Sequence, residues 1–184
     1  EAGVGKTQLA KAIANTVQGT NSRIQFTPDL LPSDVTGVTI YDQSTQQFSF
    51  KPGPIFATIV LADEINRASP KTQSALLEVM EESHVTVDGV RHDVSRPFMV
   101  IATQNPIEQA GTYRLPEAQL DRFLMKTSLG YPDHETMVEL FSQAENRDRS
   151  ASISPVIRAQ DVAQLATFAS GVHVDPAILA YVSR

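Results

Sequence analysis

The segment ATIVLADE, residues 57–64, constrains the fold of this chain more than any other feature. Its apolar residues run on without alternation and several are β-branched, which is typical of a strand buried on both faces of a parallel sheet. Asp63 and Glu64 follow the run directly, so they lie at the carboxyl end of the strand, where open α/β sheets bind ligands. The segment predicts an α/β protein with two acids at a ligand-binding edge.

Hydrophobic periodicity and turn residues predict further strands, two hairpins and several helices around this segment. Strands are expected at 23–27, 57–64, 98–105 and 122–129, and hairpins at 38–51 and 84–94, the second turning at Asp88-Gly89. Helices are expected at 6–17 with Leu9, Ile13 and Val17 as the buried face, from Ser69-Pro70 with an apolar stripe of Leu76, Val79 and Met80, from Pro116, from Pro132-Asp133, at 160–169 and from Asp175-Pro176. Strands and helices therefore mix before residue 131, and only helices follow.

A glycine-rich stretch opens the chain, with Gly3, Gly5, Lys6 and Thr7 just before a helical pattern. It matches the end of the P-loop pattern G-x-x-x-x-G-K-[ST], whose first glycine would fall one position before Glu1. In that pattern, backbone N–H groups at a helix N-terminus hold phosphates, Lys6 reaches the β and γ phosphates, and Thr7 binds Mg²⁺. The alternative is a glycine-rich helix entry with a chance Gly-Lys-Thr.

The two acids at the end of the buried strand supply what a P-loop needs next. Asp63 would hold Mg²⁺ directly or through water, and Glu64 would orient and deprotonate the attacking water. The alternative is a strand end whose acids are simply solvated. The candidate metal ligands are therefore Thr7 and Asp63.

Asn105 ends the apolar segment FMVIATQN, at the same edge of the expected sheet. Its uncharged amide suits contact with both the γ-phosphate and the attacking water. Asn105 could instead be a turn residue before Pro106.

Arg122 follows a short predicted helix, where an exposed guanidinium could reach the nucleotide of a neighbouring subunit. The alternative is a surface salt bridge with Asp121 or Glu117. Arg67 and Arg114 are further exposed arginine candidates.

Composition limits the other classes of function. The 184 residues carry a net charge of −6, which makes nucleic acid an unlikely main partner. No apolar run approaches the roughly 18 residues of a membrane span. The chain has no cysteine, which fits a reducing compartment, so a cytoplasmic location is expected. The four histidines show no metal-ligand spacing, and the acids of residues 78–82 are expected on a solvated helix face.

The segments GVGKT, LADEINRASPKTQSALLEVMEE, ATQNPIEQAGTYRLPEAQLDRF and GYPD together resemble the MoxR family of AAA+ ATPases. The resemblance implies an αβα P-loop NTPase core with a parallel sheet of strand order 5-1-4-3-2, strand 1 being missing here, followed by a small all-α lid. It implies that Gly3 to Thr7 form the Walker A motif and IVLADE the Walker B motif, with Asn105 as sensor 1 and Arg122 as the arginine finger. The expected nucleotide-binding residues are Gly3, Val4, Gly5, Lys6, Thr7, Gln8 and Asp63, and the expected catalytic residues are Lys6, Glu64, Asn105 and Arg122.

The same resemblance assigns roles to three further segments. Gln25 stands where relatives have a switch residue that contacts the Walker B glutamate. Residues 38–51 correspond to the helix-2 insert and residues 84–94 to the pre-sensor-1 hairpin, both of which would project toward a ring pore where client proteins bind. Residues 1–130 would form the nucleotide-binding core and residues 131–184 the start of the lid, each truncated, so that the second sensor arginine lies outside the chain.

The leading hypothesis is therefore a Mg²⁺-dependent ATPase that forms a ring, expected to be a hexamer, and remodels, matures or inserts cofactors into partner proteins. Its expected partners are a protein client or a protein with a von Willebrand A domain. One alternative is a chelatase subunit or a DNA-remodelling motor, since those share the two hairpins. Another is a nucleotide-gated scaffold that binds ATP without turnover, against which the presence of both Asp63 and Glu64 speaks.

Overall fold

A three-stranded parallel sheet forms the centre of the molecule in this computed structural model, which describes residues 4–105, 111–142 and 149–183. Its strands are β2 (Asn21–Gln25), β5 (Ile59–Asp63) and β8 (Met99–Ala102), in the order β2-β5-β8. All five residues of β5 are buried, as its continuous apolar sequence predicts. The order agrees with the 4-3-2 part of the expected sheet, and the fold is the expected P-loop α/β type.

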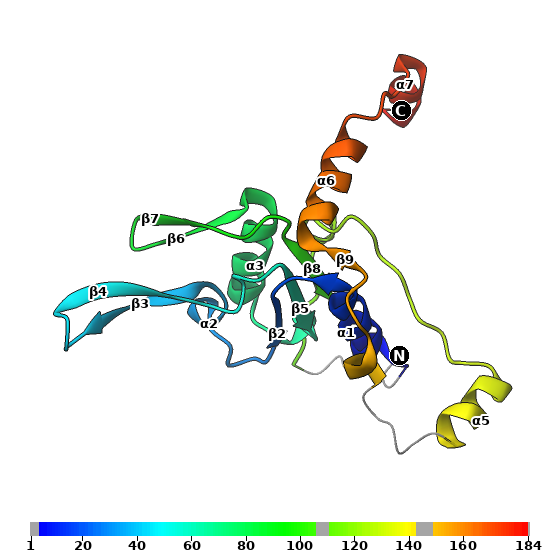
Figure 1. The fold of residues 1–184 in the computed structure, drawn as a ribbon, viewed down its shortest axis with the longest axis horizontal. Coiled ribbons are helices and arrows are strands. Elements are labelled where there is room, and N and C mark those ends of the chain that lie inside the picture. Colours follow the sequence, from blue (N-terminus) through cyan, green and yellow to red (C-terminus); the bar gives the residue numbers. More distant parts are fainter. Residues whose placement is uncertain (1–3, 106–110, 143–148, 184) are drawn as a thin grey trace.

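Two helices are closely associated with this sheet (Figure 1). α3 (Pro70–Glu82) begins at Ser69, whose side chain accepts a hydrogen bond from the backbone N–H of Thr72, and it buries Leu76 and Val79 as predicted. α1 (Lys6–Thr16) differs from the prediction, because Leu9 and Ile13 are 44% and 41% exposed while Ala10 and Ala14 are buried. The small side chains allow α1 to approach β5 closely, so they form the buried face in place of the larger ones.

The strand predicted at 122–129 is absent from the described residues, which run there as turns and coil with Leu124 and Met125 exposed. None of the sheets in the described part of the chain offers this segment a partner strand. A short parallel pair, β1 (Val17–Gln18) with β9 (Ile157–Arg158), forms instead elsewhere and was not predicted.

Both predicted hairpins form and project from the same side of the sheet (Figure 1). The longer pairs β3 (Gly37–Asp42) with β4 (Gln47–Pro52) and follows the short helix α2 (Pro32–Thr36). The shorter pairs β6 (His84–Val87) with β7 (Val90–Asp93) through a two-residue turn, with φ of 50° at Asp88 and 78° at Gly89. Positive φ at both turn residues is what the Asp-Gly sequence favours.

An aromatic stack connects the two hairpins. The ring of Phe50 on β4 lies parallel to the imidazole of His92 on β7, with centroids 3.8 Å apart. Phe50 also meets Phe56 edge-on, with ring centroids 5.5 Å apart, and Phe56 packs against the main hydrophobic core. Phe50 therefore links the two hairpins to each other and to the core, alongside the direct contacts between β3 and β6 and the burial of Val85 of β6 in the core.

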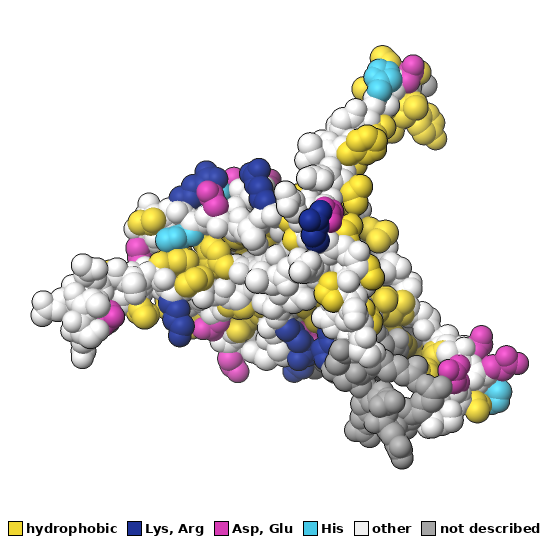
Figure 2. All heavy atoms as spheres, viewed as in Figure 1, with side chains coloured by type: hydrophobic (Ala, Val, Ile, Leu, Met, Phe, Trp, Pro, Cys, Tyr) yellow, Lys and Arg dark blue, Asp and Glu magenta, His cyan; other side chains and the backbone are white. Residues whose placement is uncertain are grey.

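The remaining elements are short or exposed. α4 (Glu117–Leu120) begins after Pro116, and the 3-10 turns η1 (Ile65–Arg67) and η2 (Arg149–Ser152) are single turns. Helices form where three were predicted: α5 (His134–Ser142), α6 (Ala159–Ser170) and α7 (Pro176–Val182). None of the three has a buried residue. Apolar side chains are exposed on the arm that α6 and α7 make (Figure 2). No helix in the described ranges has the length and apolar character needed to cross a membrane.

Candidate nucleotide-binding site

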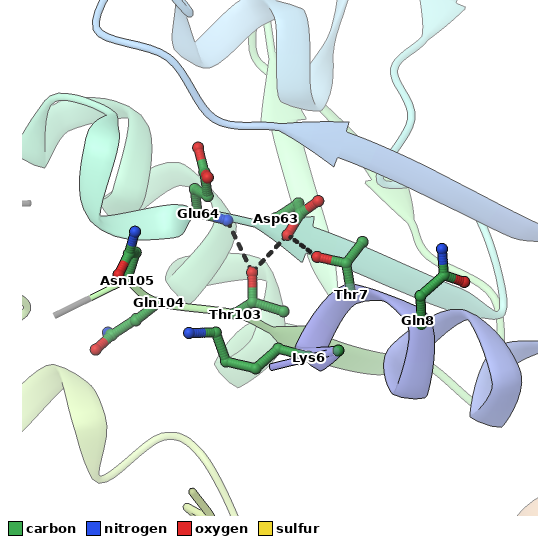
Figure 3. Close-up of a pocket in the computed structure, with 9 residues that line it drawn as sticks. Lys6, Thr7, Gln8, Asp63, Glu64, Thr103, Gln104 and Asn105 are labelled. Atoms are coloured by element: carbon green, nitrogen blue, oxygen red, sulfur yellow. Dashed lines mark hydrogen bonds between the residues drawn. The ribbon is translucent and has the colours of Figure 1, made fainter. Parts of the chain in front are cut away.

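Three segments that are far apart in the sequence line one cavity of about 320 Å³. They are the start of α1, the carboxyl end of β5 and the residues after β8, and their side chains appear together in Figure 3. The lining residues are Gly5, Lys6, Thr7, Gln8, Asp63, Glu64, Thr103, Gln104 and Asn105. The cavity therefore lies at the carboxyl edge of the sheet, where it was predicted.

The glycine-rich loop meets the cavity at the N-terminus of α1. Gly5 has φ of 88° and a left-handed conformation, and open space surrounds the position where a Cβ would stand. A glycine adopts this conformation without strain, and the open space leaves room for a ligand beside the backbone. Lys6 and Thr7 follow in the first helical turn, where a helix dipole favours anions.

Thr7 and Asp63 lie side by side although 56 residues separate them. The Thr7 hydroxyl donates to Asp63 Oδ1 over 3.0 Å. The Thr103 hydroxyl donates to the same oxygen over 2.5 Å and accepts from the backbone N–H of Glu64 over 3.0 Å (Figure 3). One threonine therefore fixes both the side chain of Asp63 and the backbone of Glu64.

The other carboxylate oxygen of Asp63 belongs to an ion pair. Arg23 on β2 donates to Asp63 Oδ2 from Nη2 over 2.6 Å and from Nε over 3.3 Å. Burial alone would raise the pKa of Asp63, but hydrogen bonds from Thr103, Arg23 and Thr7 and the positive charge of Arg23 together hold it below the usual value. Asp63 is therefore ionised at neutral pH and suited to a cation.

Glu64 has an unusual backbone and two hydrogen-bond donors. Its φ of 56° and ψ of 47° are left-handed, a conformation that costs a non-glycine residue energy and concentrates at functional sites. Gln25 and Arg67 both donate to Glu64 Oε2 over 3.1 Å. Figure 3 shows the carboxylate pointing away from Lys6 and Thr7.

The Gln25–Glu64 contact is the one that the family resemblance implies. Arg67, considered above as an exposed arginine for a neighbouring subunit, instead pairs with Glu64 of its own chain.

Asn105 is buried and lines the cavity, held by Asn66 on η1. Asn66 Nδ2 donates to the carbonyl oxygen of Asn105 over 3.2 Å, and Asn66 Oδ1 accepts from the Asn105 N–H over 3.4 Å. These contacts anchor the backbone of Asn105 to η1 at the edge of the cavity that Asn105 lines.

Arg122 does not line the described cavity. Its Nε forms an ion pair with the carboxylate of Glu81 on α3, over 2.7 Å. A salt bridge was predicted as its alternative role, but with Asp121 or Glu117. The observed partner, Glu81, instead comes from α3, 41 positions earlier in the chain. Arg114 is exposed on the loop before α4.

The other predicted site residues divide three ways. Gln8 lines the cavity and Val4 does not. Gly3 is not among the residues that the structure describes. Of the histidines, His92 stacks on Phe50.

The donor set fits a magnesium nucleotide. Hard oxygen ligands, the Thr7 hydroxyl and the Asp63 carboxylate, lie together in the cavity, as Mg²⁺ prefers. The lysine and the N-terminus of an 11-residue helix beside them provide positive charge for phosphates. Thr7 and Asp63 would hold the metal, and Lys6 with the loop would hold the phosphates.

Sequence reasoning missed the two residues outside the motifs that hydrogen-bond to the Asp63 carboxylate, Thr103 and Arg23. A signal existed for each: Thr103 comes at the end of the apolar strand that leads to Asn105, and Arg23 lies two residues before Gln25, on the same face of β2. Neither belongs to a motif, so only the register of β2 against β5, with Gln25 opposite Asp63, brings Arg23 to the acid.

Comparison with known proteins agrees with this geometry. The family model described as "ATPase family associated with various cellular activities (AAA)" matches residues 1–125. YeaC of Bacillus subtilis (strain 168) is 53% identical over 180 residues, covering 98% of this chain and 56% of YeaC. Chaperone MoxR1 of Mycobacterium tuberculosis is 46% identical over 182 residues, covering 99% of this chain and 48% of MoxR1.

Among solved structures, a crystal structure of a candidate ATPase from Cytophaga hutchinsonii shares the fold with a TM-score of 0.81 and 42% identity, covering 98% of this chain and 55% of that one. The chain thus spans about half the length of the curated relatives it matches. On the matched residues, the identities and the common fold, the chain belongs to the MoxR family of AAA+ ATPases.

Proposed function

We propose that this protein hydrolyses ATP with Mg²⁺ and works as a ring, a hexamer by family resemblance, that remodels or matures a partner protein. The observation that carries the proposal is the convergence of Lys6-Thr7, Asp63-Glu64 and Asn105 from three elements on one cavity. These are the parts that phosphoryl transfer needs: a phosphate cradle, metal ligands, a group that activates water and a polar contact for the γ-phosphate.

In this proposal each residue of the chain has a separate task. Lys6 and the N–H groups at the start of α1 bind and orient the phosphates, and Thr7 and Asp63 hold the metal, which neutralises charge on the phosphate oxygens when bound. Glu64 orients the attacking water and takes its proton, and Asn105 positions that water against the γ-phosphate.

Arg122 acts on a neighbouring subunit. Its place outside the described cavity lining, on the turn after α4, is compatible with a contact across a subunit boundary. Family resemblance further supports a protein client or a von Willebrand A domain partner, including cofactor insertion, and a cytoplasmic location.

The test is ATP turnover per protomer of the full-length protein against protein concentration. Turnover should rise to a plateau as subunits associate, and Arg122→Ala should abolish the rise while Arg91→Ala, an exposed arginine on the β7 hairpin strand, leaves it. Glu64→Gln should still bind ATP but lose roughly 10²- to 10⁴-fold in kcat, the usual contribution of a general base. Its matched control is Glu82→Gln, which changes an exposed acid on α3.

Parental turnover by Glu64→Gln would overturn the assignment of the base. A flat, near-zero rate in the parent with ATP still bound would favour the scaffold alternative.

A further inference from the structure

A continuous chain of hydrogen bonds links the two acids at the end of β5 through strand β2. Asp63 Oδ2 accepts from Arg23 Nη2 over 2.6 Å, and the same Nη2 donates to Gln25 Oε1, also over 2.6 Å. Gln25 Nε2 then donates to Glu64 Oε2 over 3.1 Å. The guanidinium of Arg23 is thus shared between the metal-site acid and the glutamine that contacts the proposed base.

The position of Arg23 also determines which way the Gln25 amide points. With Oε1 toward the guanidinium and Nε2 toward the carboxylate, both contacts of Gln25 are favourable. The flipped amide would place an NH₂ against a cation and an oxygen against an anion, so both contacts would become repulsive. Arg23 therefore fixes the amide in the orientation that lets Gln25 hold Glu64.

The geometry places Glu64 in a standby position. Gln25 and Arg67 both occupy its Oε2, and Figure 3 shows the carboxylate turned away from Lys6 and Thr7. A carboxylate held in this way must leave one or both donors before it can reach a water molecule in the cavity.

We propose that Arg23 is a positioning residue that holds Glu64 away from the cavity through Gln25. The strength of the Arg23–Gln25 hydrogen bond depends on the net charge at Asp63, with which Arg23 also pairs. This inference rests on the proposed function. A cation bound at Asp63 repels the guanidinium and competes for Oδ2, so metal binding loosens Arg23, frees the Gln25 amide to turn and leaves Arg67 as the remaining donor to Glu64. Metal binding at Asp63 thus changes the hydrogen bonding of Glu64.

The first test does not involve turnover. The side-chain amide signal of Gln25 in the ¹H–¹⁵N NMR spectrum of the full-length protein, identified by its loss in Gln25→Ala, reports its hydrogen bonds. Arg23→Met should shift this signal, and so should addition of Mg²⁺ with ADP to the parent protein. Arg91→Met, which removes an exposed ion pair with Asp93 on the shorter hairpin, should leave it in place.

Arg23→Lys is a second variant in case Arg23→Met does not fold. It keeps a positive charge for Asp63 but lacks the planar fork that serves Asp63 and Gln25 together, so the Gln25 signal should shift with it as well. An unchanged Gln25 signal in a folded Arg23 variant would overturn the proposal, whatever the turnover.

The second test compares kcat and KM for ATP. Arg23→Met and Gln25→Ala should each raise kcat by about two- to tenfold, the effect of losing one hydrogen bond, with little change in KM. Because both act through one contact, the double variant should match the single ones.

Effects that multiply, or a fall in kcat, would overturn the holding role. A parent without turnover whose Gln25 signal still shifts in Arg23→Met would refute the proposed function and support the positioning role of Arg23.

Discussion

Replacing Thr103 with valine removes one hydroxyl from the site and leaves its volume almost unchanged. That hydroxyl donates to Asp63 Oδ1 and accepts from the N–H of Glu64. The Asp63 side chain is only 5% exposed, so water replaces the lost donor poorly, and a hydrogen bond to a charged group contributes about 1.5–3 kcal/mol. Glu64 is half-buried, so its N–H adds a smaller cost, about 1 kcal/mol. We expect Thr103→Val to lower the free energy of unfolding by about 2.5–4 kcal/mol.

Urea unfolding followed by circular dichroism measures this difference. Thr103→Ser is the matched control, because it keeps the hydroxyl and loses one methyl group, at a cost of about 0.5–1.5 kcal/mol. The excess loss in Thr103→Val should also diminish in acid, where Asp63 is protonated and the bond is no longer made to a charge. Equal losses for valine and serine at neutral pH would refute the assignment of Thr103 as the residue that fixes both acids.

Two further changes test other parts of the structure. The folded-state pKa of Asp63 lies below the usual 3.8, so its ionised form stabilises the folded protein fully above about pH 4, and this contribution disappears as pH falls through the folded-state pKa. The difference in unfolding free energy between the protein and Asp63→Asn should therefore shrink from about pH 6 to about pH 3, and a difference that grows in acid would contradict the lowered pKa. Ser69→Ala removes the cap of α3 and should lower the free energy of unfolding in urea by about 1 kcal/mol. The control, Ser74→Ala on the exposed face of the same helix, should change it by less than about 0.5 kcal/mol. Equal effects of the two substitutions would contradict the cap.

The sequence predicted those parts of the fold that local signals determine. The apolar run of β5, the Asp-Gly turn of the shorter hairpin and the Ser-Pro start of α3 each form where expected, because each depends on residues within a few positions. The failures depend on distant partners. The segment 122–129 has a strand-like sequence but no partner strand among the residues that the structure describes, and the buried face of α1 depends on its contact with β5.

The candidate site shows the same division. The motifs named Thr7, Asp63 and Asn105, and the structure brings these three to one cavity. Spacing in the sequence could not show that Thr103 bonds both acids, because that contact depends on the register between β5 and β8. The Glu81 partner of Arg122 was likewise beyond local patterns, since 41 positions separate the two residues.

The stack of Phe50 between His92 and Phe56 gives the two hairpins a common mechanical support. A force applied to the tip of the longer hairpin passes down β4 to Phe50, and from there it is divided between the shorter hairpin and the hydrophobic core. Face-to-face rings resist compression but slide past one another easily, so this junction transmits a push along the stacking axis better than a sideways pull. The Phe50 junction therefore couples the two hairpins mechanically, in parallel with the direct contacts between β3 and β6.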